Sequence, residues 1–124
     1  MGVHWIGNIA GGWSSAFPKI HPLKDIEQLD NYSFPTPDYL KLSDEDKEYL
    51  RKADRENHII IGWVWPWFIF ERANKLMDIT NLIKSIFTHP KEVKRLFHRI
   101  ADFNIQALER FIDLFDGILL CEDA

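Results

Sequence analysis

The residues best suited to chemistry stand where an apolar run of the chain ends. The run 58–65 is short, unbroken and rich in β-branched and aromatic residues, as in a strand buried on both faces. Pro66 ends it, because proline donates no N–H to a ladder and is tolerated in the first turn of a helix. Sites in parallel α/β proteins gather at the carboxyl ends of strands. We therefore expect substrate-binding candidates here: Trp65, Trp67, Phe70, Glu71 and Arg72.

Two adjacent carboxylates, Glu122 and Asp123, follow a second apolar run, 118–121. At the carboxyl end of a strand, a desolvated carboxylate could polarise a substrate or hold a proton. The alternative is a solvated chain end without a chemical role. Both interpretations stay open from the residues alone, and both carboxylates remain substrate-binding candidates.

The aromatic and charged candidates have structural alternatives as well. Trp63 and Trp65 share one face of the predicted strand, since alternate strand residues point the same way. Together with Trp67 they could stack on a flat macrocycle, or they could simply fill the core, which is the commoner use of buried aromatics. Glu71 and Arg72 could point into a pocket or form helix-surface ion pairs worth under ~1 kcal/mol.

Composition limits the class of protein. The chain has 124 residues, which suits one domain, and its net charge of −4 argues against nucleic acid or an anionic membrane as a partner. Its single cysteine, Cys121, excludes an internal disulfide and fits a reducing compartment. No signal peptide is visible, and the longest apolar run is too short to span a bilayer. We expect a cytoplasmic protein.

Metal sites are not expected in this chain. The histidines show no metal-ligand spacing and no accompanying cysteine pair. They are His4, His21, His58, His89 and His98. Phosphate-binding glycine loops, nucleophile elbows and zinc-helix motifs are likewise absent from the sequence.

The segments that position these candidates follow from local signals. Residues 1–43 read as an irregular segment and connector, because glycine and proline interrupt any period. Ser43 is expected to cap a surface helix over 44–55. A helix is predicted from Pro66 to about Met77, followed by a second that Thr80 can cap. The third and longest starts at 89–92, with a proline in its first turn and Glu92 placed as in a capping box.

The third predicted helix has one apolar stripe at three- and four-residue steps. Its residues are Val93, Leu96, Phe97, Ile100, Phe103, Ala107, Leu108 and Phe111. The order strand 58–65, three helices, strand 118–121 predicts a parallel crossover, so that 58–124 forms one strand–helices–strand unit. Two apolar parallel strands leave their outer edges unpaired, and we therefore expect 1–124 to be a single incomplete α/β domain that self-associates through those edges or belongs to a larger sheet.

Several stretches along the chain, taken together in their order and spacing, resemble the uroporphyrinogen decarboxylase superfamily. They are Gly2-Val3-His4-Trp5, His21-Pro22-Leu23 with Asp25 and Leu29, Pro35-Thr36-Pro37-Asp38, the strand with Gly62 and Trp65, Phe70-Glu71-Arg72-Ala73, His89-Pro90-Lys91-Glu92-Val93, and Asp116-Gly117-Ile118 with Glu122-Asp123. The resemblance covers essentially the whole chain. It implies a (β/α)8 barrel, which needs ~250 residues. We thus expect a partial barrel, an internal piece lacking the first strands and everything after 118–121.

The family resemblance implies two activities. Some members decarboxylate the acetate arms of uroporphyrinogen in porphyrin biosynthesis, and relatives transfer methyl groups between corrinoid proteins and thiols. The decarboxylases carry a tyrosine where this chain has Phe70, which has no hydroxyl, and a substrate-contacting serine where it has Glu122. These departures place the chain closer to the methyltransferase-like and uncharacterised relatives.

Neither activity is expected of this chain alone. By the same resemblance, the key aspartate and arginines of the decarboxylases fall upstream of Met1, and the zinc ligands of the methyltransferases fall downstream. We therefore expect a tetrapyrrole or corrinoid-type substrate for the full-length parent, and zinc and corrinoid only in a methyltransferase-type parent. The second hypothesis is a non-catalytic binding or subunit protein whose sheet a partner completes.

Overall fold

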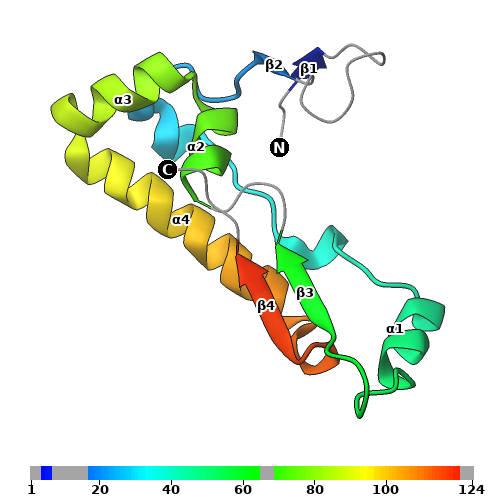
Figure 1. The fold of residues 1–124 in the computed structure, drawn as a ribbon. Coiled ribbons are helices and arrows are strands. Elements are labelled where there is room, and N and C mark those ends of the chain that lie inside the picture. Colours follow the sequence, from blue (N-terminus) through cyan, green and yellow to red (C-terminus); the bar gives the residue numbers. More distant parts are fainter. Residues whose placement is uncertain (1–3, 7–16, 65–68, 121–124) are drawn as a thin grey trace.

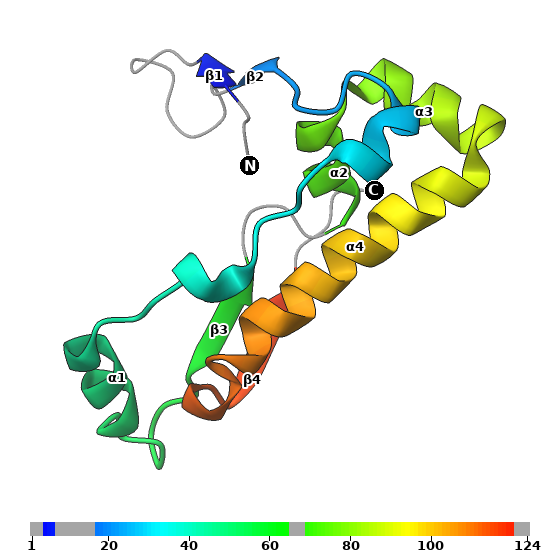
Figure 2. The same cartoon turned by 180° about the vertical axis from the view of Figure 1, so that it is seen from behind.

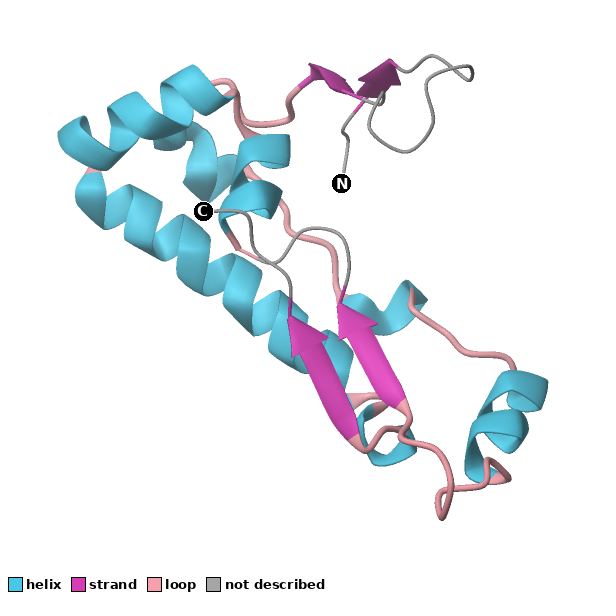
Figure 3. Cartoon of the chain, viewed as in Figure 1, coloured by secondary structure: helices cyan, strands magenta, loops and turns pink. Residues whose placement is uncertain are grey.

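The computed structural model describes residues 4–6, 17–64 and 69–120 of the chain, and this part is mostly helical (Figures 1 and 3). The antiparallel strands β1 (His4–Ile6) and β2 (Phe17–Ile20) come first. Short 3-10 helices then cover Ile26–Asn31 and Pro37–Tyr39. Asp25 caps the first of them by accepting a hydrogen bond from the Glu27 N–H at 3.2 Å. Regular structure therefore occurs within the segment that the sequence reads as irregular.

The predicted surface helix is α1 (Asp44–Arg51), and Ser43 is its N-cap. The Ser43 Oγ accepts a hydrogen bond from the Asp46 N–H at 3.0 Å, as predicted. The helix ends before residue 55 because the Asp54 carboxylate forms a local turn, accepting hydrogen bonds from the N–H groups of Glu56 and Asn57. In both views α1 lies near the amino end of the strand Ile61–Val64, at the opposite end of the described chain from β1 and β2 (Figures 1 and 2).

The two apolar runs contain the strands β3 (Ile61–Val64) and β4 (Gly117–Leu120), which pair in parallel. Their register aligns Ile61 with Gly117 and Val64 with Leu120. Between them lie α2 (Phe70–Leu76), α3 (Ile79–Thr88) and α4 (Pro90–Glu109). The strand predicted over 58–65 starts later, at Ile61. The backbone N–H of His58 bonds to the Asp54 carbonyl at 3.0 Å, and that of Ile60 bonds to the Asp116 side chain, so neither joins a strand ladder.

One helix start and one capping interaction differ from the predicted ones. The start predicted at Pro66 lies outside the described residues, and α2 begins at Phe70 after its N-cap Ile69. Asp78, not Thr80, caps α3, since its carboxylate accepts hydrogen bonds from the N–H groups of Thr80 and Asn81. Pro90 occupies the first turn of α4 as predicted. The predicted capping box of Glu92 has no free donor to satisfy, because the N–H of the cap residue His89 already bonds to the Ser85 carbonyl at 2.8 Å.

The hydrophobic core lies among the helices. The apolar stripe of α4 faces it with Val93, Leu96 and Ile100, while the 3-10 helix 26–31, α2 and α3 supply most of the rest. The buried core residues are Leu23, Ile26, Leu29, Ala73, Leu76, Met77, Leu82, Val93, Leu96 and Ile100. None of them belongs to β3 or β4, so the parallel pair lies outside this core.

The expectation of a partial (β/α)8 barrel is wrong. The described residues form a small, mostly helical domain with one parallel strand pair and a separate antiparallel pair. A barrel wall requires each strand to pair on both edges, and within 4–6, 17–64 and 69–120 each strand pairs on one edge only. An apolar, β-branched run predicts a strand but does not specify how many strands pair with it.

Candidate functional site

The carboxyl ends of β3 and β4 lie side by side, since Val64 is the register partner of Leu120 (Figure 1). In the sequence, Trp65 and Trp67 follow β3, and Glu122 and Asp123 follow β4. These four predicted site residues lie outside the residues that the structure describes. The described part of the site is therefore the end of the strand pair and the start of α2.

Hydrogen bonds at the other end of the pair hold the two strands in register. The Asp116 carboxylate accepts from the Ile60 N–H at 2.9 Å, and the Asp116 N–H donates to the Ile60 carbonyl at 2.8 Å. Arg55 forms an ion pair with Asp116 and donates to the Leu114 carbonyl at 2.9 Å. The Ile60 hydrogen bond and, after it, Arg55 lower the pKa of Asp116 below its ordinary value. Asp116 thus connects the loops that precede both strands.

Phe70, the first residue of α2, packs on the helical core. Its ring meets Phe97 of α4 edge to face, with 6.5 Å between the ring centroids. It is partly buried against the core cluster, where an aromatic side chain removes a large apolar area from water. These contacts of Phe70 are those of a core residue.

Glu71 and Arg72 are both partly buried. The Arg72 guanidinium lies over the Phe103 ring of α4, 5.4 Å from its centroid, within the range of a cation–π contact. Phe70 and Arg72 are therefore brought to two aromatic residues of the same helix. In this arrangement the Phe70 ring is engaged in packing, and the Arg72 cation suits binding of an anionic group more than proton transfer.

Sequence reasoning missed an interaction that positions the chain next to α4. Arg99 donates hydrogen bonds to the carbonyls of Leu29 at 2.9 Å and Tyr32 at 3.2 Å, and its guanidinium lies 4.2 Å from the centroid of the Phe34 ring. The only sequence signal is an arginine at the margin of the apolar stripe. Its partners are about 70 residues away in the chain, so spacing could not reveal them.

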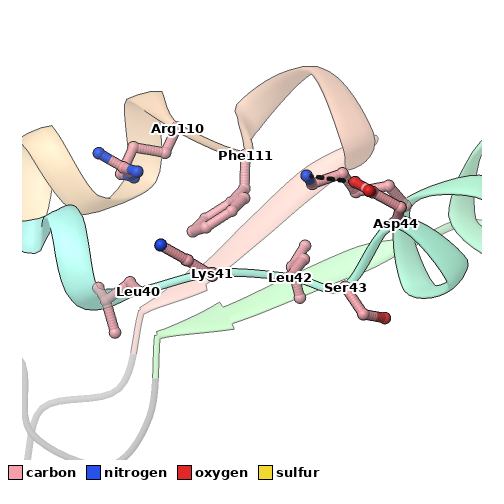
Figure 4. A pocket seen from close by; sticks show the side chains of 8 residues that line it. Leu40, Lys41, Leu42, Ser43, Asp44, Arg110 and Phe111 are labelled. Carbon is pink, nitrogen blue, oxygen red and sulfur yellow. Dashed lines mark hydrogen bonds and ion pairs between the residues drawn. The ribbon is translucent and has the colours of Figure 1, made fainter.

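No pattern in the sequence indicated a hollow of about 730 Å³ on the folded chain (Figure 4). It lies between the connector that precedes α1 and the residues that end α4. Its lining consists of Leu40, Lys41, Leu42, Ser43, Asp44, Lys47, Arg110 and Phe111. Arg110 and Phe111 read in the sequence as the end of an ordinary amphipathic helix, and only the folded chain brings two lysines to them.

Within the described residues, no group of three or more His, Cys, Asp or Glu side chains is placed to hold a metal ion. No helix in the same part of the chain is both long and apolar enough to cross a membrane. Comparison with protein-family models, with curated proteins and with solved structures found no match for this chain.

Proposed function

We propose that this chain is the part of a uroporphyrinogen decarboxylase-like enzyme that carries one wall of its substrate site, and that it is catalytically silent alone. The observation that carries the proposal is the adjacency of the carboxyl ends of β3 and β4, with Val64 beside Leu120. In parallel α/β proteins this edge is where ligands bind. The motifs that carry the family resemblance include both segments that leave this edge.

Two branches of chemistry follow from the proposal. In a decarboxylase the ligand is a tetrapyrrole carboxylate, whereas in a methyltransferase-type parent it is a corrinoid, with zinc held elsewhere in the protein. Arg72, partly buried and stacked on Phe103, is suited to an acidic arm of either ligand. The lone Cys121 supports a location in a reducing compartment such as the cytoplasm.

Tryptophan fluorescence of the purified chain tests this function. We expect uroporphyrin, a stable oxidised form of the tetrapyrrole, to quench the emission with saturation if the decarboxylase branch is correct. Hydroxocobalamin should do so for the corrinoid branch. The variant Trp65→Phe/Trp67→Phe should lose most of the saturable quenching, whereas Trp5→Phe, from the amino-terminal hairpin, should keep it. Absence of saturable quenching by both ligands would reject the enzyme proposal.

A second candidate function is a binding or subunit protein whose strand pair is covered by a partner. The observation in its favour is the exposure of four large apolar side chains on and just before the strands, which ranges from 49% to 76%. They are Ile59, Ile61, Leu119 and Leu120. Parallel strands are ordinarily buried on both faces, so such exposure favours a surface that other protein covers.

Size-exclusion chromatography separates the two candidates. A stable, monodisperse species of the 124-residue chain favours the subunit, while aggregation or molten behaviour favours a piece of a larger enzyme. Leu119→Lys should reduce any self-association, because it places a charge on the exposed strand. Tyr49→Lys is a matched control, since Tyr49 is also an exposed large side chain but belongs to α1 and not to either strand.

A further inference from the structure

The hollow beside Phe111 has the size of a small-molecule site. Its volume of about 730 Å³ falls in the range of ligand pockets, which is roughly 300–1,000 Å³. It shares no residue with the candidate site at the ends of β3 and β4, and its interpretation does not rest on the proposed function. Figure 4 shows the Phe111 ring pointing into the hollow between the end of α4 and the connector.

The hollow has an apolar floor. Phe111, Leu40 and Leu42 line it, and all three are only partly buried, so they leave apolar surface within reach of a ligand. An aromatic ring or a short acyl chain laid against Phe111 would remove that surface from water.

Three cations, Lys41, Lys47 and Arg110, surround this floor. Lys47 pairs with Asp44 at 3.0 Å and Arg110 with Asp38 at 2.8 Å. Both carboxylates are largely exposed, and exposed pairs of this kind contribute little stability, so a ligand can replace them at small cost. Lys41 forms no ion pair with any residue in the described part of the chain.

The charges select the kind of anion. The cations exceed the two carboxylates by one, in a chain whose net charge is −4. The first turn of α1 carries Asp44, Glu45 and Asp46, and the Ser43 Oγ accepts the hydrogen bond of the Asp46 N–H. The three carboxylates of this turn would repel a phosphate dianion more strongly than a monoanion, which disfavours the dianion. A monoanion with an apolar body can pair with the cations and pack against the apolar lining of the hollow.

We propose that this hollow binds an amphipathic carboxylate, with its aromatic or acyl body against Phe111 and its carboxylate on Lys41 and Arg110. In Figure 4 the nitrogen ends of Lys41 and Arg110 lie on the same side of the Phe111 ring. Because both cations line this hollow, we place the carboxylate where each of them donates a hydrogen bond to it, with the apolar body against Phe111.

A titration followed by ¹⁵N–¹H NMR on the full chain tests the proposal, with 4-phenylbutyrate as the probe and 4-phenylbutanol as its uncharged analogue. We expect saturable shifts centred on the amides of Lys41, Arg110 and Phe111, and affinity for the alcohol about tenfold lower. Equal affinity for acid and alcohol would overturn the proposal. So would shifts centred on the exposed apolar residues of α3, which are Ile79, Ile83, Ile86 and Phe87.

Variants distinguish binding at this specific site from non-specific attraction of anions to the protein surface. Lys41→Met and Arg110→Met should each weaken the affinity for 4-phenylbutyrate about tenfold. Lys52→Met is the matched control, because this exposed lysine caps α1 and lies outside the lining of the hollow. An equal loss in the control would show non-specific charge attraction and reject the site. Circular dichroism of each variant verifies that its fold is retained.

Discussion

The Phe115 ring lies so close to Gly62 of β3 that an added Cβ atom at Gly62 would stand 2.7 Å from its Cδ2 and 2.9 Å from its Cγ. Both are atoms of a ring near its attachment to the backbone, so they cannot swing aside as the tip of a flexible side chain would. Gly62 is thus required by close packing between the strand pair and the loop that precedes β4.

We predict that Gly62→Ala lowers the free energy of unfolding by about 2 kcal/mol, as overpacked substitutions do. Gly117→Ala in β4 is the matched control: its Cβ would meet only the terminal Cδ1 of Ile61, at 3.3 Å, and the effect should be smaller. Urea denaturation followed by circular dichroism measures both. Equal losses in the two variants would contradict the packing explanation.

Acid should weaken the structure partly through Asp116. Its pKa is lowered from the ordinary 3.8 in the folded chain, mainly by the hydrogen bond from the Ile60 N–H. The ionised carboxylate therefore contributes stability that is fully present above the ordinary pKa and is lost as the pH falls through the lowered one. Asp116→Asn should flatten the decline of the urea midpoint between about pH 5 and pH 2.

Asp54 should add to the same acid sensitivity. Hydrogen bonds from the Asn57 side chain and from the backbone N–H groups of Glu56 and Asn57 lower its pKa. The double variant Asp54→Asn/Asp116→Asn should show a shallower pH dependence than either single variant. A wild-type slope in the double variant would contradict both assignments.

Arg99 should matter more than its neighbour on the same helix. Arg99→Met removes two hydrogen bonds to carbonyls and the contact with Phe34, and we expect a loss of about 2 kcal/mol. Arg95→Met, one turn earlier, removes only an exposed pair with Asp30 and should cost under about 1 kcal/mol. Thermal and urea unfolding compare them, and a larger loss for Arg95→Met would refute the ranking.

The N-cap of α3 supports a further prediction. Asp78→Ala should cost about 1 kcal/mol, because it leaves the N–H groups of Thr80 and Asn81 without their acceptor. Thr80→Ala should have little effect, since Thr80 is already inside the helix. A larger loss of stability for Thr80→Ala than for Asp78→Ala in urea denaturation would indicate that Thr80 is the cap.

Much of the local structure could be predicted from particular residues. Ser43 and the acids after it indicated the start of α1, Pro90 indicated the start of α4, and the three- and four-residue spacing of Val93, Leu96 and Ile100 identified the buried face of α4. These signals act within one or two turns of helix, where capping and periodicity operate. The same local reasoning failed at Thr80, because Asp78, two residues earlier, competes for the same N–H groups.

By itself, then, the sequence determined the cap of α1, the buried face of α4 and the apolar runs that contain β3 and β4. Tertiary structure alone decided that the core gathers among the helices, that the strand pair has no further neighbours among the described residues, and that Lys41 meets Phe111. The physical reason is the separation along the chain over which each interaction acts. Caps and periodicity depend on adjacent residues, whereas the extent of a sheet and the lining of a hollow depend on contacts between segments that the chain order leaves far apart.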